Sequence, residues 1–373
     1  MSDRALFRCP ALVDVHVHFR EPGFSYKETI AGGCQAAAAG GYTTVCTMPN
    51  LNPAPDSPAT LERQMEIIRS DATINVLPYA AITMGRKGSE VVDIAALKGS
   101  VVAFSDDGSG VQNEEVMLKA MKAIASNDAI LAAHCEDNSL LNGGYIHDGS
   151  YAREHGHKGI CSRSEWGQIE RDIELAGRTG CAYHVCHIST KESVELIRKA
   201  KARGVNISCE TAPHYLLLTE NDLQEEGRFK MNPPLRAIED RDALIEGIQD
   251  GTIDMIATDH APHSDEEKSR GLAGSAMGIV GLPTAFPLLY TGLVKEGIIS
   301  LDKLVDLMSA APRRRFRLPQ APDDYAFFDL EGTWKINSSE FPGHGHSTPF
   351  DGWEVQGRCV RTVYKGKTIF DIL

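Results

Sequence analysis

The sequence contains no apolar run of the roughly 18 residues that a membrane-spanning helix needs. Its first residues, "MSDRALFRCPALVD", also lack the apolar stretch that is typical of a secretory signal peptide. CxxC pairs are absent as well, and the nine cysteines are scattered and odd in number, which indicates reduced, mostly buried thiols rather than a disulfide framework. Together these absences predict a cytoplasmic protein.

Positive charge is scarce, because 38 lysines and arginines stand against 51 aspartates and glutamates and the formal net charge is -13. A surface of this kind repels nucleic acids and anionic membranes. The one basic run, "RRRFR" at 313–317, is interpreted as the solvated end of a helix. An anionic small substrate would therefore have to be held by individually placed arginines.

Short β-branched segments alternate along the chain with longer helical patterns. The candidate strands are "LVDVHV" (12–17), "TTVCT" (43–47), "INVLPYAAI" (74–82), "VVAFSD" (101–106), "AILAAH" (129–134), "AYHVCHI" (182–188), "NISCET" (206–211) and "DMIATD" (254–259). Eight β/α units over roughly 250 residues are typical of a parallel (β/α)8 barrel of the TIM type. The sequence therefore predicts an α/β fold with this architecture.

An open, doubly wound sheet is the alternative arrangement of such units, and it leads us to expect a Gly-rich phosphate turn after the first strand. No such turn follows residues 12–17. After residue 318 the pattern changes, and the tail alternates like antiparallel strands. We expect a barrel over residues 12–318, with residues 1–11 and 319–373 forming a small β appendage packed on it.

Polar side chains stand at the carboxyl ends of five candidate strands, which is where the active sites of such barrels lie. His16 and His18 share one face of the first strand, because they are two residues apart. The others are Asp107 after the fourth strand, His134 at the end of the fifth, His187 at the end of the sixth and Asp259 at the end of the eighth. Imidazoles suit borderline divalent metals, zinc first, and a carboxylate can bridge two ions. The joint pattern predicts a binuclear metal site.

The remaining histidines are interpreted as structural or surface residues. His184 faces away from His187 on the same strand, and His260 points away from its neighbour Asp259. His214 in "TAPHYL" stays undecided. Surface or loop positions are expected for His147, His155, His157, His344 and His346.

Several motifs together resemble those of the amidohydrolase superfamily and, within it, the dihydroorotases. They follow the expected order over most of the chain: "DVHVHFREPG" (14–23), "TMPN" (47–50), "FSDDGSGVQ" (104–112), "AHCEDNSL" (133–140), "YHVCHISTKES" (183–193), "FKMNPPLR" (229–236) and "IATDHAPHSDEEK" (256–268). HxH followed by RE is more specific than HxH alone, and with "ATDHAPH" it resembles the bacterial type. The resemblance implies reversible interconversion of dihydroorotate and N-carbamoyl-L-aspartate in de novo pyrimidine biosynthesis.

The resemblance also implies two divalent metal ions per chain, with Zn2+ as the expected ion. One would be held by His16, His18 and Asp259, and the other by His134 and His187, with a bridge between them. Many relatives bridge with a carboxylated lysine, but "VVAFSDD" contains none and resembles the subgroup in which Asp107 bridges. Ions of this kind lower the pKa of a shared water and polarise the substrate carbonyl. Asp259 would then act as general base and afterwards as general acid.

Substrate recognition is assigned to a further set of residues. Arg20 lies two residues after His18, and its planar guanidinium can bind the ring carboxylate of dihydroorotate in bidentate fashion. The resemblance adds Asn50 and His263 at the same carboxylate, Asn232 near the pyrimidine ring, and backbone groups around Met277 and Gly278.

Two other functions remain open from the sequence. One is a hydantoinase or allantoinase acting on another cyclic amide, and Arg20 with Asn50 argues for a carboxylate-bearing substrate instead. The other is a non-catalytic, dihydroorotase-like subunit that supports aspartate transcarbamoylase, although every inferred metal ligand is present.

Family members usually carry a longer segment before the first barrel strand, where this chain has eleven residues. A homo-oligomer or a complex with aspartate transcarbamoylase is therefore a predicted partner arrangement, in which another chain covers the open edge of the appendage.

Overall fold

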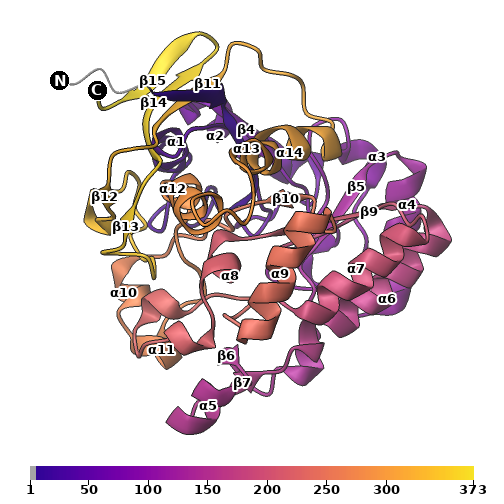
Figure 1. Cartoon of the computed structure of the whole chain (residues 1–373). Coiled ribbons are helices and arrows are strands. Elements are labelled where there is room, and N and C mark those ends of the chain that lie inside the picture. Colours follow the sequence, from indigo (N-terminus) through magenta and orange to yellow (C-terminus); the bar gives the residue numbers. More distant parts are fainter. Residues whose placement is uncertain (1–5) are drawn as a thin grey trace.

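A computed structural model of the chain describes residues 6–373 and shows an α/β fold in which parallel strands alternate with helices (Figure 1). The parallel strands are β2 (Leu12–Val17), β3 (Tyr42–Thr47), β4 (Asn75–Pro78), β5 (Ile130–Ala133), β8 (Ala182–Val185), β9 (Ile207–Thr211) and β10 (Met255–Ile256). They form two sheets with the strand orders β2-β3-β4 and β10-β9-β8-β5. The prediction of an α/β fold with parallel strands is confirmed.

The fourth predicted strand, at residues 101–106, does not form. Only Phe104 keeps parallel bridges there, to Ala80 on one side and to Leu131 on the other. Asp106 instead accepts hydrogen bonds from the backbone N–H groups of Ile82 and Thr83, at 2.8 and 3.1 Å from its Oδ1. The Asp106 side chain therefore binds the backbone of the segment that follows β4.

Longer helices cover the outer side of the parallel strands. They are α1 (Ile30–Ala39), α2 (Pro58–Asp71), α4 (Glu114–Ser126), α6 (Arg163–Thr179), α7 (Lys191–Ala202) and α9 (Ile238–Asp250). In α6 the buried apolar residues Ile169, Ile173 and Ala176 recur at helical spacing and face the sheet. The start of α2 is fixed by Ser57, whose hydroxyl accepts from Thr60 N, and by Pro58 in the first turn.

Short helices and strands occupy the connections. The short helices are α3 (Ile94–Leu97), α5 (Ser150–His155), α8 (Pro213–Leu217), α10 (Asp265–Lys268), α11 (Gly271–Gly274), α12 (Ala285–Leu289), α13 (Leu301–Val305) and α14 (Ala311–Arg315), with the π-helical turns η5 (Tyr290–Val294) and η6 (Asp306–Ala310). The strand pairs are β6 (Ile146–His147) with β7 (Gly159–Ile160), and β12 (Trp334–Lys335) with β13 (Glu354–Val355). No helix within residues 6–373 is long and apolar enough to cross a membrane.

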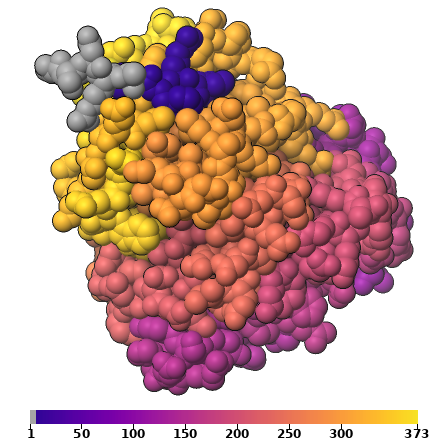
Figure 2. All heavy atoms as spheres, in the orientation of Figure 1, coloured from indigo at the N-terminus to yellow at the C-terminus, as the bar shows by residue number. Residues whose placement is uncertain are grey.

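The tail of the chain forms an antiparallel sheet together with the first described strand. Its order is β1-β11-β14-β15, with β1 at Phe7–Pro10, β11 at Tyr325–Asp329, β14 at Arg358–Tyr364 and β15 at Lys367–Asp371. Figure 2 shows the indigo start of the described chain beside its yellow and orange end. Phe328 of β11 is fully buried and stacks on Phe286 of α12 at a ring distance of 3.8 Å, which docks this sheet on the α/β layer. The division into a barrel at 12–318 and an appendage stays a prediction.

Two expectations about polar surface residues are wrong. Arg313 of the "RRRFR" run is 7% exposed, because its guanidinium turns inward and donates to the carbonyl of Pro319. His147 is 8% exposed and lies against Arg236, with 3.3 Å between its Nδ1 and the arginine NH1. Both side chains are buried by contacts with other segments of the chain, and the sequence composition does not indicate such contacts.

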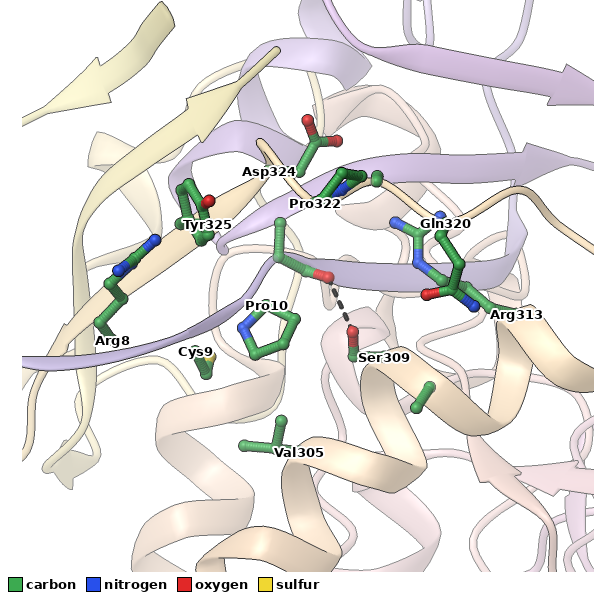
Figure 3. A pocket seen from close by; sticks show the side chains of 13 residues that line it. Arg8, Cys9, Pro10, Val305, Ser309, Arg313, Gln320, Pro322, Asp324 and Tyr325 are labelled. Atoms are coloured by element: carbon green, nitrogen blue, oxygen red, sulfur yellow. Dashed lines mark hydrogen bonds between the residues drawn. The ribbon is translucent and has the colours of Figure 1, made fainter. Parts of the chain in front are cut away.

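A cavity of about 370 Å³ lies near the amino-terminal end of β2 (Figure 3). Its lining includes Arg8, Pro10, Arg313 and Tyr325, and Ser309 beside it donates a hydrogen bond to the carbonyl of Ala11. Active sites of β/α folds lie at the opposite, carboxyl ends of the strands. The functional site is therefore expected at the other end of the strands, although the cavity there is smaller, at about 250 Å³.

Candidate active site

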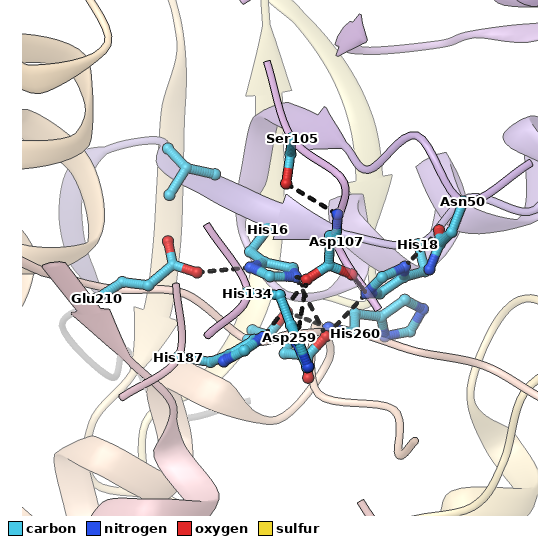
Figure 4. A network of polar contacts seen from close by, with 12 residues as sticks. His16, His18, Asn50, Ser105, Asp107, His134, His187, Glu210, Asp259 and His260 are labelled. Atoms are coloured by element: carbon cyan, nitrogen blue, oxygen red, sulfur yellow. Dashed lines mark hydrogen bonds and ion pairs between the residues drawn. The ribbon is translucent and has the colours of Figure 1, made fainter. Parts of the chain in front are cut away.

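The predicted metal ligands come together in one buried cluster at the carboxyl ends of the parallel strands (Figure 4). His16 is the last residue but one of β2, and His18 follows that strand directly. His134 follows β5, and His187 and Asp259 lie a few residues after β8 and β10. Asp107 lies three residues after Phe104, which forms the parallel bridges to Ala80 and Leu131. All of these side chains are buried, and His16 has no exposed surface.

His16, His18 and Asp259 form the first subset of donors. His18 Nε2 lies 2.9 Å from Asp259 Oδ1, and His16 Nε2 lies 3.5 Å from the same oxygen. Two donors bound about 2.0–2.1 Å from one tetrahedral zinc ion are about 3.3 Å apart. The spacing of the three donors therefore fits a single divalent cation.

Asp107, His134 and His187 form the second subset, in which His134 Nδ1 lies 3.0 Å from His187 Nε2. The carboxylate of Asp107 lies between the two subsets. Its Oδ1 is 3.4 Å from His187 Nε2 and 3.3 Å from His16 Nε2, and its Oδ2 is 3.5 Å from His18 Nε2. The Asp107 carboxylate is therefore close to rings of both subsets.

Unsatisfied atoms indicate that the cluster is built for cations. Within the described residues, His16 Nε2 and Asp107 Oδ1 are buried in the cluster and have no hydrogen-bond partner. Buried polar atoms of this kind normally have partners, and leaving them unpaired costs about 1–3 kcal/mol each. The donor set of imidazoles and carboxylates is also the one that zinc and similar ions prefer. The residues therefore fit two divalent metal ions.

Two hydrogen-bond acceptors fix the orientation of the His16 and His18 rings. His16 Nδ1–H donates to Glu210 Oε1 at 2.6 Å, and His18 Nδ1–H donates to Asn50 Oδ1 at 2.9 Å. Each bond leaves the Nε2 lone pair directed at the cluster, which is the usual role of an acceptor behind a metal-binding histidine. Burial alone would raise the pKa of Glu210, but His16 outweighs it and lowers the pKa to about 2. Glu210 is therefore ionised at neutral pH.

The backbone is strained at two of the predicted metal ligands. His187 has φ 32° and Asp259 has φ 47°, both in the left-handed region that residues other than glycine rarely adopt. Such a conformation costs about 1–3 kcal/mol and persists only where the surroundings enforce it. Here it turns the side chains that follow β8 and β10 into the cluster.

A cavity of about 250 Å³ opens beside the cluster, and every residue predicted for the site except His16 lines it. Arg20 is anchored there by a hydrogen bond from its Nε to the carbonyl of Pro262 at 3.1 Å. Burial lowers the pKa of Arg20 to about 10, so its guanidinium stays charged at neutral pH. The cavity thus presents a fixed cation a short distance from the predicted metal ligands.

His263 lies next to Arg20 and is neutral. Burial, with the charges of Arg20 and Lys27, lowers its pKa to about 3. Its Nε2–H donates to the carbonyl of Met277 at 2.8 Å, and its Nδ1 accepts from Lys27 Nζ at 3.3 Å. Arg20 NH2 is 3.4 Å from a nitrogen that already carries a proton, so this donor remains available for an anion.

Asn232 also lines the cavity and donates from Nδ2 to Glu136 Oε1 at 2.9 Å. The second oxygen of Glu136 is 3.7 Å from His134 Nε2. Burial opposes ionisation of Glu136, but His134 and Asn232 outweigh it, and its pKa lies below the ordinary value. An ionised carboxylate therefore connects a predicted metal ligand with a predicted substrate contact.

Comparison with known proteins identifies the family to which the chain belongs. The family described as "Dihydro-orotase-like" matches residues 6–193. A dihydroorotase of Bacillus caldolyticus is 52% identical over 370 residues, which is 97% of this chain and 87% of the relative. Another, of Fusobacterium nucleatum subsp. nucleatum, is 50% identical over 371 residues and covers 98% of this chain and 87% of its own length. The chain belongs to the dihydroorotase family.

Solved structures with the same fold carry other names at low sequence identity. An L-hydantoinase (dihydropyrimidinase) from Arthrobacter aurescens superimposes with a TM-score of 0.88 at 24% identity, covering 98% of this chain and 86% of the other. A dihydropyrimidinase from Brevibacillus agri gives a TM-score of 0.83 at 20% identity, covering 98% and 85%. At these identities the likeness concerns the fold, which this dihydroorotase-family chain shares with them.

Sequence reasoning missed Glu210 and Glu136. Glu210 lies inside a predicted strand that is otherwise apolar or small, and an acidic residue buried in such a strand is a signal that could have found it. Glu136 sits two residues after His134 in "AHCED" and carries no such signal. The expectation for His184 is confirmed, since its ring lies 3.0 Å from Glu210 Oε2 and 2.7 Å from Ser208 Oγ. His214, left undecided, is buried, and its Nε2 has no partner among the described residues.

Replacing Glu210 with glutamine is expected to weaken metal binding by about 10- to 100-fold, because acceptors behind metal-binding histidines have effects of this size. The neutral amide can offer its –NH2 to His16 and no longer fixes one tautomer. Metal retained after dialysis against graded chelator concentrations measures the change. Glu195→Gln is the matched control, since that carboxylate lies on the exposed face of α7 and pairs with Lys199 and Arg198. Equal retention by both variants would contradict the role given to Glu210.

Proposed function

We propose that the chain catalyses the reversible hydrolysis of dihydroorotate to N-carbamoyl-L-aspartate with two divalent cations, zinc being the expected ion. As a member of the dihydroorotase family the chain is a cyclic amide hydrolase of pyrimidine biosynthesis. The observation that carries the finer proposal is the cluster of six donors with unpaired nitrogen and oxygen atoms, set beside a cavity that contains a buried arginine.

Six side chains would hold the two cations. His16, His18 and Asp259 are assigned to one, His134 and His187 to the other, and Asp107 to the bridge. The short distances from Asp107 Oδ1 to His16 Nε2 and His187 Nε2, 3.3 and 3.4 Å, support this bridging role. When bound, such cations lower the pKa of a water molecule and polarise the carbonyl to be attacked.

Asp259 is assigned the proton transfers. Its carboxylate lies at the edge of the cluster and also lines the cavity, so it reaches both the attacking water and the ring of a bound substrate. Burial opposes its ionisation, but His16 and His18 outweigh it and hold the pKa of Asp259 below its ordinary value. It would accept a proton from the water and donate it to the departing ring nitrogen, as general base and then general acid.

Arg20 is assigned to the ring carboxylate of the substrate, because its free N–H groups face the cavity and a guanidinium pairs with a carboxylate at two points. Asn50 and His263 flank it and are assigned to the same carboxylate. Asn232 would hold the pyrimidine ring, and backbone groups at Met277 and Gly278 would complete the wall of the cavity.

Closure of the parallel strands into a (β/α)8 barrel is part of the proposal, because it would bring all six donors to one mouth. The parallel bridges from Ala80 to Phe104 and from Phe104 to Leu131 support a link between β4 and β5. The bridge from Val17 to His260 supports the closing contact between β2 and the segment after β10.

The test is a hydrolysis assay on dihydroorotate with the metal content determined on the same sample. We expect turnover in both directions, about two zinc ions per chain, loss of activity after chelation and its return with added Zn2+. Full activity with one ion or none would refute the binuclear centre. Hydantoin turnover at comparable kcat/KM would refute the assignment of the substrate.

Association with a second copy or with aspartate transcarbamoylase stays a prediction. Size-exclusion chromatography of the chain with and without purified aspartate transcarbamoylase measures it, and elution at the mass of a single chain in both runs would contradict it.

A further inference from the structure

Lys268 is a buried lysine at the end of α10 that no role described above uses. Its side chain is 8% exposed, and its Nζ donates to three backbone carbonyls, of Lys230 at 3.0 Å, Ala276 at 2.8 Å and Gly278 at 2.7 Å. Within residues 6–373, no carboxylate forms an ion pair with it. An ammonium group has three donors and no acceptor, so this one is fully occupied by the three carbonyls.

The three carbonyls belong to the chain segments that form one wall of the substrate cavity. Lys230 lies two residues before Asn232, and Ala276 and Gly278 flank Met277. Asn232, Met277 and Gly278 all line the cavity. The backbone N–H of Gly278 donates to the same Lys230 carbonyl at 3.0 Å. Lys268 therefore joins two cavity-lining segments that are far apart in the sequence.

The segment 276–278 is tightly packed against its neighbours. Gly278 has φ +138°, and a Cβ at this position would lie 2.6 Å from the carbonyl oxygen of Ala261 and 3.1 Å from the His263 ring. The carbonyl of Met277 also accepts the hydrogen bond from His263 Nε2. A shift of this segment would therefore move His263 and the cavity wall together.

We propose that Lys268 is a positioning residue for substrate binding, whose ammonium group holds the segments 230–232 and 276–278 at the separation that the substrate requires. The proposal rests on the proposed function for the identity of the substrate. It assigns Lys268 no contact with the substrate or with the metal ligands, so it predicts an effect on KM that is separate from kcat and from metal content.

The test is Lys268→Met, which keeps the length of the side chain and removes all three donors. We expect KM for dihydroorotate to rise about tenfold or more, with kcat within about threefold of the wild type and unchanged metal content. Hydrogen exchange at the peptide covering 276–281 is expected to become faster. Lys268→Arg keeps a charged donor, so its KM is expected to lie between those of Lys268→Met and the wild type.

Lys201→Met is the matched control, because that lysine also donates to a backbone carbonyl, of Gly251, but at the far end of α7. Its KM is expected to equal that of the wild type. If Lys268→Met does not fold, Lys268→Gln is measured by the same criterion. A folded, metal-loaded variant with wild-type KM, or one in which only kcat falls, overturns the proposal. An inactive wild type would instead overturn the proposed function.

Discussion

Replacing Asp259 with asparagine is expected to lower kcat for dihydroorotate by about 10²–10⁴-fold, the range that a positioned general acid or base contributes. The amide cannot accept a proton from the attacking water, although it has nearly the same shape and can still bind through its oxygen. Steady-state kinetics on protein whose metal content has been determined separates this loss from a loss of metal. The fall should appear in kcat at every pH between 6 and 9.

Asp254 provides a matched control because it precedes β10, whereas Asp259 follows the same strand. Its carboxylate accepts a hydrogen bond from Cys209 N at 2.8 Å and pairs with Lys201 at 2.7 Å, far from the cavity. Asp254→Asn is expected to change stability and to leave kcat within about twofold. A metal-loaded Asp259→Asn variant with wild-type kcat would show that Asp259 is not the general acid and base.

Replacing Arg20 with alanine is expected to reduce kcat/KM for dihydroorotate by roughly 10²- to 5 × 10³-fold, since removing one partner of a buried charge pair costs roughly 3–5 kcal/mol. The substrate carboxylate would then enter a buried site without a counter-charge. Arg20→Lys is expected to recover only part of the loss, because an ammonium cannot reproduce the two-point contact of a guanidinium.

Comparison of two substrates makes the Arg20 test specific. Dihydrouracil lacks the ring carboxylate, so its kcat/KM, low in the wild type, should be changed little by Arg20→Ala. Arg198→Ala, on the exposed face of α7 and paired with Asp250, serves as the control and should leave both substrates unaffected. Equal losses for the two substrates would show that Arg20 supports the fold of the site and does not recognise the carboxylate.

The sequence was sufficient to predict most of the candidate site because strand ends are local features. His16 and His18 follow an apolar run, and His134 and His187 end similar runs, so the alternation of β and α segments brings them together. Arg20 could be placed by its spacing from His18 alone. The family resemblance then supplied Asn50 and Asn232, which no periodicity indicated.

Other parts of the site depend on contacts between distant segments. The Glu210 carboxylate behind His16 and the Lys268 link between two loops arise from pairs far apart in the chain, and neither residue belongs to a spacing pattern. The strand expected at 101–106 is reduced to the bridges of Phe104, and the hydrogen bonds from residues 82–83 to the Asp106 side chain beside it follow no pattern in the sequence. The left-handed backbone of His187 and Asp259 is uncommon even for histidine and aspartate, which adopt it more often than most residues, and no spacing pattern in the sequence marks these two positions.

The pairing of β1 with β11 has a consequence for synthesis on the ribosome. Phe7 pairs with Phe328 and Pro10 with Tyr325, so β1 leaves the ribosome roughly 320 residues before the strand that pairs with it. At about 5–20 residues per second, the delay lasts roughly 15–60 seconds, during which the strand's unpaired edge is exposed. We therefore expect the α/β layer to assemble first on the nascent chain and the tail sheet to form last. Chaperone binding early in translation should accordingly concentrate on the segment that contains β1.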